Sequence, residues 1–427
     1  MDFDFHLPQL ELNEILDADG FVRSFESNDY KSIQSFYQQY GFVVVRNIFT
    51  KEECQNTRKV MWDIVNNNDN NNKGKYSLSM RGPCFAQQLI RNRCNYNLIK
   101  IIAYLFQVDP ELILVNHDRF TIYRPTLNHP ELQTGQANIH LDLNPWWWVD
   151  KKQGREMIIP GLEKLNYGSS GTLKKNQQDF IRENNYVSQS IGNGYHIQSV
   201  FNFNDNYVDD GGTLVVPYFH LYIDKWIQIN NHLYKTLPFL TLDLESIEHK
   251  KLLSNSIRIP MRSGSILLWN QSLAHGTQPN SSTNPRLAQF CKFFVRGKNN
   301  DNNNDNDNDN DENNKYWPSE ERLIKRAKGL IKSLNQSKVL TIVINDNLQT
   351  KLILKILTKD ENDDEEEDDE RKKKLALKTL GLDVLSVNEI LEEIITYHNN
   401  NSNQINIEDK LEYIHLELDL RRTQNIK

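Results

Sequence analysis

The feature that most constrains the fold is a short stretch, from Asn138 to Leu143, in which polar and aliphatic side chains alternate. Alternation over this length predicts a strand, with His140 and Asp142 on one face and Leu141 packed on the other. An imidazole and a carboxylate two residues apart supply two legs of the facial triad that binds non-haem Fe(II) and leaves the opposite positions open. The third leg requires a second histidine.

Two other pairs of a histidine and an acidic residue compete with this one. The pair that begins at His129 has a proline between its members, which fits poorly in a paired strand. The pair at His415 has no histidine after it that could complete a triad. Only His140 and Asp142 keep a downstream partner, which is His275. Each histidine alone is more often structural than a ligand, so the prediction rests on the ordered set.

Arg286 adds a residue that could bind a co-substrate. It lies eleven residues after His275, at the head of an apolar segment that predicts a strand. Iron needs no guanidinium, but the distal carboxylate of 2-oxoglutarate does, through a bidentate, charge-assisted pair.

The ordered set of His140-x-Asp142, His275 with the following Gly-Thr, and Arg286 resembles the phytanoyl-CoA dioxygenase family of Fe(II)/2-oxoglutarate oxygenases. The segment 36–49 is similar to the opening helix-turn-strand of that family, and the resemblance runs from about residue 30 to residue 296. It implies that His140, Asp142 and His275 are the metal ligands and catalytic residues, and that Arg286 binds the co-substrate.

The resemblance also implies the reaction. An Fe(II)- and 2-oxoglutarate-dependent dioxygenase would consume O2, release succinate and CO2, and hydroxylate a small organic substrate through a ferryl intermediate. The family name suggests an acyl or lipid-derived substrate. Halogenating members have a small residue where this chain has Asp142, so the carboxylate favours hydroxylation.

Two further contacts with the co-substrate follow from the resemblance. Thr277 stands where the family commonly has a serine that contacts 2-oxoglutarate. Tyr123, on the strand before the metal motif, is the second candidate, with a buried structural phenol as the alternative. The lysine that assists in some members has no match.

Three successive tryptophans, 146–148, follow the metal motif. They cannot all belong to the core of one element, so we expect Trp146 or Trp148 to face the mouth of the site and contact the substrate. The alternative is a hydrophobic clamp that holds a long loop in place.

The strand pattern predicts a mainly β protein with flanking helices, a double-stranded β-helix of the jelly-roll or cupin-like class. Amphipathic spacing predicts helices over 30–40, 51–65 and 98–106, and Thr50 with Glu53 predicts a capping box. Gly211 and Gly212 are expected to serve a turn. Short strands are predicted over 42–45, 112–115, 120–123, 137–143, 195–203, 212–216, 256–259, 265–269 and 287–295.

Composition divides the chain. Asn-rich and acidic tracts cannot bury enough apolar surface to offset the entropy of ordering, so we expect them to be solvated insert, linker or tail. The predicted parts are an irregular lead-in (1–29), a jelly-roll dioxygenase domain (30–297) with an Asn-rich insert (66–72), a disordered Asn/Asp linker (298–315), and a helical C-terminal appendage (316–427) with an acidic run (360–370).

Charge and cysteine content limit the possible partners and the cellular compartment. The net charge is −7, but the two acidic tracts carry six and ten acidic residues without Lys or Arg, so the rest carries +9. A basic body favours an anionic substrate, with ordinary surface lysines as the alternative. Four cysteines without Cys-x-x-Cys spacing, an acidic N-terminus, no Ser-Lys-Leu ending and no long apolar run predict a cytoplasmic protein. The expected partner is a small molecule, without nucleic acid or membrane.

Two alternatives remain at the level of function. The jelly roll could be a non-catalytic module that binds the metal without turnover, although retention of Asp142 and Arg286 favours catalysis. The same chemistry could also act on protein side chains, as other 2-oxoglutarate oxygenases do. A wide, charged mouth would favour a protein substrate, whereas a closed apolar pocket would favour a small molecule.

Overall fold

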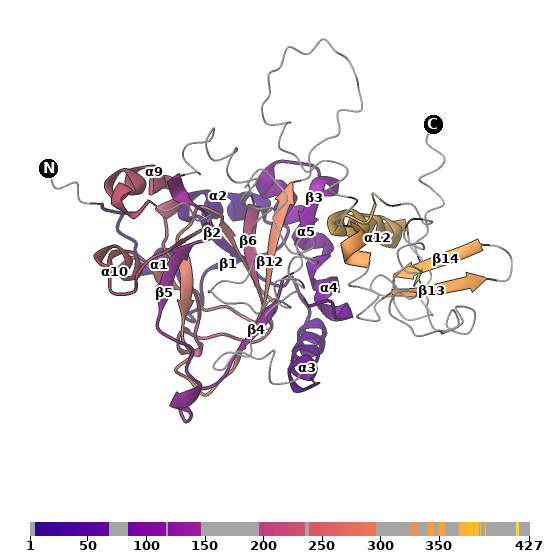
Figure 1. The fold of residues 1–427 in the computed structure, drawn as a ribbon, viewed down its shortest axis with the longest axis horizontal. Coiled ribbons are helices and arrows are strands. Elements are labelled where there is room, and N and C mark those ends of the chain that lie inside the picture. Colours follow the sequence, from indigo (N-terminus) through magenta and orange to yellow (C-terminus); the bar gives the residue numbers. More distant parts are fainter. Residues whose placement is uncertain are drawn as a thin grey trace, which may run out of the picture.

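The computed structural model has a β core with helices around it (Figure 1). It describes residues 5–67, 84–116, 118–146, 196–234 and 239–295, and, nearer the C-terminus, 324, 327–331, 340–345, 349–354, 367–383, 385, 389 and 416–417.

The larger sheet has seven strands, in the order β1-β2-β10-β6-β12-β3, with β4 also paired to β12. All its pairs are antiparallel except β1 with β2. Its strands are β1 (Ser24–Phe25), β2 (Phe42–Val45), β3 (Ile113–Val115), β4 (Phe120–Tyr123), β6 (His196–Asn202), β10 (Ile266–Asn270) and β12 (Arg286–Val295).

The smaller sheet has five antiparallel strands, in the order β8-β5-β11-β7-β9. Its strands are β5 (Asn138–Leu141), β7 (Gly212–Val215), β8 (Leu240–Thr241), β9 (Ile257–Arg258) and β11 (His275–Gln278). The two sheets face each other, because Arg286 and Lys292 of β12 reach Thr213 of β7 and Asp142 after β5. The predicted jelly-roll class is confirmed, as two facing sheets rather than a closed barrel.

Helices flank this core. Helix α2 packs on β2 and β10, α5 packs on β3, and α10 packs on β5. The helices are α1 (Leu12–Ile15), α2 (Tyr30–Tyr40), α3 (Lys51–Asn67), α4 (Gln87–Arg93), α5 (Tyr96–Phe106), α9 (Phe219–Ile229), α10 (Ile247–Ser254) and α12 (Glu367–Leu380), with short 3-10 turns at Pro110–Leu112, Pro130–Leu132, Val208–Asp210 and Asn231–Leu233.

Local signals explain why the N-terminal elements begin and end where predicted. The Asp29 side chain accepts a hydrogen bond from the backbone of Ser32 at the start of α2, and Gly41 ends the helix with φ of 81°. The capping box at α3 is present: Thr50 N donates to Glu53 Oε2 at 2.7 Å, and Glu53 N donates to Thr50 Oγ1 at 3.1 Å. Helix α3 continues two residues beyond the predicted end.

Several elements differ from the sequence-based prediction. Strand β5 ends at Leu141, so Asp142 follows the strand instead of lying within it. Strand β11 and helices α4, α9 and α10 were not predicted. The acidic run 360–370 is not solvated tail throughout, because α12 begins at Glu367. Of the predicted insert, residues 66 and 67 end α3, while 68–72 and the linker 298–315 lie outside the described residues.

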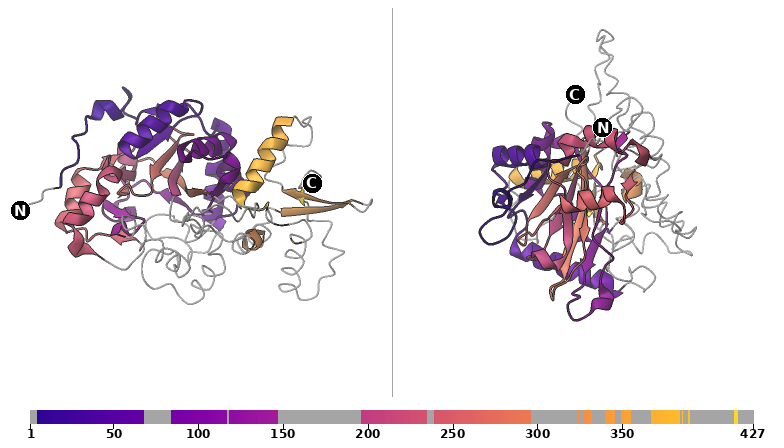
Figure 2. Two further views of the ribbon diagram at one scale, coloured as in Figure 1. Left: turned by 90° about the horizontal axis from the view of Figure 1, so that it is seen from above. Right: turned by 90° about the vertical axis from the view of Figure 1, so that its left-hand side faces the viewer.

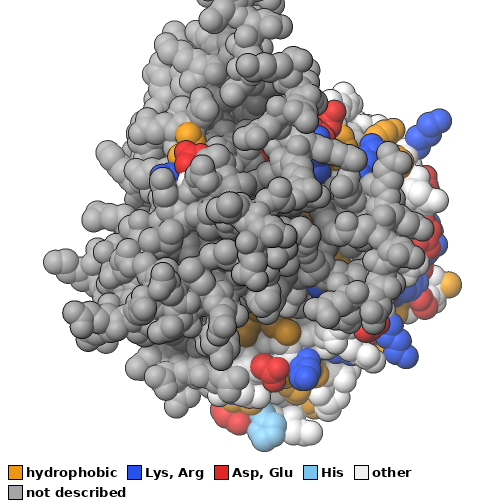
Figure 3. Space-filling view, turned by 90° about the vertical axis from the view of Figure 1, so that its right-hand side faces the viewer, with side chains coloured by type: hydrophobic (Ala, Val, Ile, Leu, Met, Phe, Trp, Pro, Cys, Tyr) orange, Lys and Arg blue, Asp and Glu red, His pale blue; other side chains and the backbone are white. Residues whose placement is uncertain are grey.

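The C-terminal part contains more than helix. Strands β13 (Leu340–Asn345), β14 (Gln349–Leu354) and β15 (Leu416–Glu417) form a three-stranded sheet beside α12, at the end of the molecule opposite α9 and α10 in Figure 1. Figure 2 shows α12 and this sheet projecting beyond the two main sheets. Where the structure describes the face drawn in Figure 3, acidic and basic side chains are interspersed.

Candidate metal and co-substrate site

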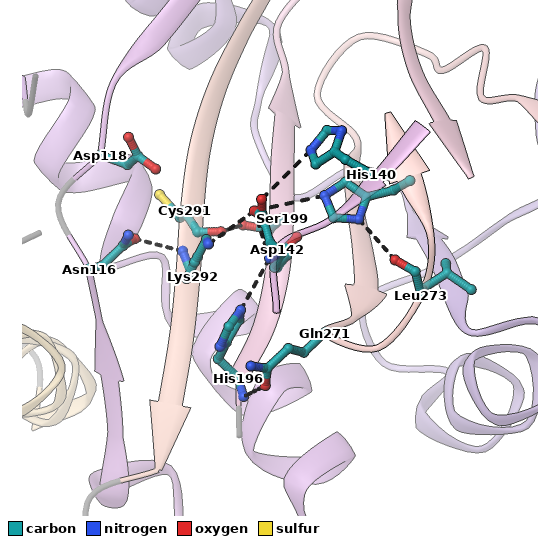
Figure 4. A network of polar contacts seen from close by, with 12 residues as sticks. Asn116, Asp118, His140, Asp142, His196, Ser199, Gln271, Leu273, Cys291 and Lys292 are labelled. Atoms are coloured by element: carbon teal, nitrogen blue, oxygen red, sulfur yellow. Dashed lines mark hydrogen bonds and ion pairs between the residues drawn. The ribbon is translucent and has the colours of Figure 1, made fainter. Parts of the chain in front are cut away.

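The two candidate histidines lie opposite each other on neighbouring strands. His140 on β5 and His275 at the start of β11 are register partners, and their ring centroids are 4.6 Å apart. Asp142 completes the group: its Oδ1 lies 3.7 Å from Nε2 of His140 and its Oδ2 lies 3.8 Å from Nε2 of His275. One ligand atom from each residue lies within 4.8 Å of the others. Figure 4 shows His140 and Asp142 in this network.

Hydrogen bonds orient both imidazoles. Nδ1 of His140 lies 3.1 Å from Oδ1 of Asn138, and Nδ1 of His275 lies 2.9 Å from the backbone oxygen of Leu273. The Asn138 amide is itself oriented, because its Nδ2 donates to Oγ1 of Thr277 at 3.1 Å. Since these oxygens only accept, each Nδ1 carries the proton and each Nε2 keeps its lone pair for a ligand role.

The protonation states suit a divalent cation. Burial lowers the pKa of His275 to about 4, helped by the neighbouring His140, and burial also lowers the pKa of His140. Burial alone would raise the pKa of Asp142, but Lys292 and the two histidines hold it well below its ordinary value. Two neutral imidazoles and one carboxylate at neutral pH form the donor set of a facial triad.

Arg286 is a buried guanidinium with unused hydrogen-bonding capacity. It is 2% exposed, and its Nη2 donates to Thr213 Oγ1 at 3.1 Å. Among the described residues no carboxylate pairs with it, and its Nη1 has no hydrogen-bond partner. Burial lowers its pKa. An uncompensated buried cation is costly, so this environment fits an anionic ligand.

The backbone makes room for this guanidinium. Gly212 has φ of 120°, and a Cβ there would lie 2.5 Å from Nε of Arg286. Any larger residue at this position would collide with the guanidinium. Gly211 has φ of 76° and accepts a hydrogen bond from Arg258. Burial, with Arg286 nearby, lowers the pKa of Arg258 to about 9. Both glycines serve the predicted turn, and Gly212 also accommodates Arg286.

One same-face step along paired strands separates His275 from the threonine that contacts Arg286. His275 and Thr277 lie on the same face of β11, and Thr213, which holds Arg286, is the register partner of Thr277 on β7. Two residues along a strand correspond to roughly 7 Å. A molecule that bound the metal next to His275 would therefore reach Arg286 past the hydroxyls of Thr277 and Thr213.

Tyr123 contacts this site through Arg286. The two residues are register partners on β4 and β12, and Cζ of Arg286 lies 5.2 Å from the centre of the Tyr123 ring. The phenol ring is therefore a packing surface for the guanidinium. A hydrogen bond from Tyr123 to a co-substrate stays a prediction.

Trp146 packs on helix α9. Its ring centroid lies 6.3 Å from that of Trp226 and 5.5 Å from that of Tyr234. These contacts are those of the hydrophobic clamp that was the alternative interpretation, and substrate contact by Trp146 stays a prediction. Trp148 lies outside the described residues.

Three residues near the site were missed. Lys292 is 8% exposed, and its Nζ lies 3.1 Å from Oδ2 of Asp142. Gln198 donates to the same oxygen at 3.0 Å. His249 accepts a hydrogen bond from the backbone of Ile139 at 3.1 Å and so supports β5 beside His140. Lys292 could have been found, because it lies six residues after Arg286 and therefore on the same face of one strand.

The rival pair that begins at His129 takes no part in the site. His129 caps a 3-10 turn at the surface, 3.2 Å from Glu131. His415 lies outside the described residues. In the part of the chain that the structure describes, no helix is long and apolar enough to cross a membrane.

Comparisons relate the chain to a protein family and to solved structures. A family model described as Phytanoyl-CoA dioxygenase (PhyH) matches residues 171–288. The solved structure of GlcNAc Inducible Gene 2, GIG2, from Candida albicans has 13% identity and a TM-score of 0.50, with 92% of this chain and 88% of that chain covered. The epimerase SnoN, solved with Fe3+, alpha ketoglutarate and nogalamycin RO, is more distant, with 12% identity and a TM-score of 0.40 over 62% of this chain and 83% of that chain.

Sequence similarity to a curated relative is stronger. A Dictyostelium discoideum protein, provisionally named phytanoyl-CoA dioxygenase, is 32% identical over 315 residues, which cover 65% of this chain and 84% of that protein. The aligned length includes most of the relative. The chain therefore belongs to the phytanoyl-CoA dioxygenase family of Fe(II)/2-oxoglutarate-dependent dioxygenases.

Proposed function

We propose that this dioxygenase hydroxylates a small organic molecule, with Fe(II) held by His140, Asp142 and His275 and with 2-oxoglutarate held by Arg286. The observation that carries the proposal is the arrangement of the two sites. The triad of metal-binding groups lies on and next to β5 and β11, and one same-face step away Thr213 of β7 accepts a hydrogen bond from Arg286. This guanidinium comes from β12 of the facing sheet and has no carboxylate partner among the described residues.

The residues have distinct roles in this proposal. His140, Asp142 and His275 would hold the metal and would leave its other positions for co-substrate and dioxygen. Arg286 binds the distal carboxylate of 2-oxoglutarate, and its contact with Thr213 fixes the guanidinium. Thr277, two residues after His275 on β11, would contact the co-substrate between its two ends.

Fe(II) and 2-oxoglutarate, when bound, supply the oxidation, in which O2 is consumed and succinate and CO2 are released. The protein contributes placement and exclusion of water. His275 and Arg286 are both almost fully buried, so charges in this site are screened weakly. An ionised Asp142 and two neutral imidazoles are ready for the metal without loss of a proton.

The proposal is tested by anaerobic titration of the purified protein with Fe(II) and then 2-oxoglutarate, followed through the weak visible metal-to-ligand charge-transfer band. We expect the band in the wild type. In Arg286→Ala the loss of charge-assisted hydrogen bonds should weaken 2-oxoglutarate binding roughly 30- to 100-fold, about 2–3 kcal/mol. Substrates can then be screened by the release of succinate.

A matched control is Arg46→Gln, which removes a surface arginine paired with Glu26. This variant should bind the co-substrate like the wild type. Iron binding without a band would favour the non-catalytic module, and a wild-type protein that binds no Fe(II) would exclude the triad. Equal co-substrate affinity in wild type and Arg286→Ala would remove Arg286 from the site.

A further inference from the structure

Two polar side chains of the larger sheet face the metal-binding group from the opposite side. Lys292 on β12 and Gln198 on β6 are register partners, so their side chains lie next to each other. They are 8% and 1% exposed. Figure 4 shows Lys292 extending from β12 toward Asp142.

Both side chains hold the same oxygen atom of Asp142. Nζ of Lys292 lies 3.1 Å from Oδ2, and Nε2 of Gln198 donates to Oδ2 at 3.0 Å. A carboxylate oxygen has two lone pairs, so these two donors use both. Oδ1 of Asp142 accepts no hydrogen bond from any described residue, and it is the oxygen 3.7 Å from Nε2 of His140.

The orientation of the Gln198 amide follows from its neighbours. Nε2 lies between Oδ2 of Asp142 and Nε2 of His196, at 3.0 and 3.1 Å. The reversed amide would place its oxygen against the carboxylate, with two acceptors in contact and no hydrogen between them. Gln198 therefore donates to Asp142.

We propose that Lys292 and Gln198 are positioning residues that hold Asp142 as a ligand through Oδ1 alone. The inference rests on the proposed function of the triad. An octahedral metal would use three positions for the triad and two for 2-oxoglutarate, which would leave one for dioxygen. If Asp142 used both oxygens it would take a fourth position and compete with the co-substrate. Donors fixed on Oδ2 prevent this.

This proposal separates co-substrate binding from metal binding. Release of Oδ2 gives Asp142 a second oxygen for the metal, so Fe(II) affinity should stay the same or increase. Affinity for 2-oxoglutarate should fall, because one of its two positions becomes contested. Loss of Lys292 also removes a positive charge that attracts the dianion, whereas loss of Gln198 changes no charge. The glutamine variant therefore isolates the positioning effect.

The test uses Lys292→Met and Gln198→Leu, with Lys250→Met, which removes an exposed lysine paired with Glu245, as control. Fe(II) affinity is measured by anaerobic calorimetry, 2-oxoglutarate affinity by the charge-transfer band, and stability by the melting temperature. We expect both site variants to bind 2-oxoglutarate about tenfold more weakly or worse. Their Fe(II) dissociation constants should stay close to that of the wild type or become tighter, because the freed Oδ2 can also bind the metal. Lys250→Met should match the wild type in all three measurements.

Other outcomes overturn the proposal. Unchanged 2-oxoglutarate affinity in Gln198→Leu would show that Oδ2 needs no donor. A joint fall of metal affinity, co-substrate affinity and melting temperature would show a structural role only. If Gln198→Leu does not fold, Gln198→Met removes the donor without adding a charge and has the same expected result. Failure of the proposed function would give a different result from failure of the positioning role, because the wild type itself would then bind no Fe(II) or no 2-oxoglutarate.

Discussion

At the scale of single residues, Gly276 controls the distance between the two histidines. A Cβ at this position would overlap the backbone oxygen of Asn138 and lie 2.6 Å from its carbonyl carbon. Gly276 pairs with Ile139 in the same register that places His275 opposite His140. Any larger residue must therefore push β11 away from β5, and the two imidazoles move apart with the strands.

Gly276→Ala is expected to lower Fe(II) affinity at least tenfold, because a metal ligand displaced by a few tenths of an ångström no longer fits the coordination sphere. Stability should fall by about 1–3 kcal/mol, the usual cost of overpacking. Calorimetric titration and denaturant unfolding measure the two effects. Gly135→Ala is the matched control, since a Cβ there meets nothing within 4 Å. If Gly276→Ala binds Fe(II) with wild-type affinity, the spacing of β5 and β11 does not control the metal site.

Sequence could place the residues that carry recognisable chemistry, and it failed for those that only support them. His140, Asp142 and His275 were grouped by their order along the chain, and the structure brings them together. Gln198 and His249 have no motif, because their contacts with Asp142 and Ile139 depend on strands and helices far apart in sequence. The spacing of residues along the sequence cannot predict such contacts.

At the scale of elements, the junction of α2, β2 and α9 contains a pH-sensitive contact. Nε2 of His220 on α9 lies 3.0 Å from the backbone oxygen of Gln38 in α2, and so it carries the proton. Nδ1 of His220 is buried against Gly41 and has no hydrogen-bond partner among the described residues. Burial lowers the pKa of this imidazole, against the raising effect of the contact with Gln38.

The sign of the pH effect follows from this shift. The unfolded chain takes up a proton at His220 near pH 6.5, whereas the folded protein takes it up only at lower pH. Between these two pH values the unfolded state binds more protons than the folded state, so stability falls as the solution becomes more acidic. His220→Gln keeps a donor for Gln38 and removes the titration. We expect its free energy of unfolding to fall less than that of the wild type between pH 7 and pH 5, in urea titrations at each pH. An equal fall would contradict the assignment.

Elements were predictable where the signal was local. Helix α2 and strands β2 and β4 have the predicted bounds, because a cap, a C-terminal glycine or a compact apolar run marks each one. Strand β11 was missed since His275–Gln278 contains no aliphatic side chain, and its pairing with β5 and β7 comes from tertiary structure.

At the scale of the whole molecule, α12 covers the edge of the larger sheet. It contacts β3, the last strand in the sheet order, and also α5, and Lys378 forms an ion pair with Glu111 in the turn before β3. Its apolar side chains enter the main hydrophobic core, with Leu375 and Leu380 buried. An exposed edge strand would be open to pairing with another chain, and a packed helix blocks this.

Leu380→Ala tests whether this helix belongs to the cooperative unit that contains the metal site. Leu380 is 0% exposed, and loss of a fully buried leucine side chain costs about 2–4 kcal/mol. If α12 and the two sheets unfold together, denaturant titrations followed by far-UV circular dichroism and by the iron-dependent charge-transfer band should give the same loss in free energy of unfolding. Leu221→Ala, at a leucine that is 59% exposed on α9, should change stability by less than about 0.5 kcal/mol.

The two possible outcomes lead to different accounts of the chain. A common shift makes the C-terminal region a structural part of the dioxygenase domain. The cavity left by Leu380→Ala would then weaken the metal site only because the whole domain unfolds more easily. Two separate transitions, with the iron-dependent one unchanged, would instead make the C-terminal region an independently unfolding unit. Fe(II) affinity of the folded variant should equal that of the wild type in both cases, since no described residue beyond 295 contacts the triad.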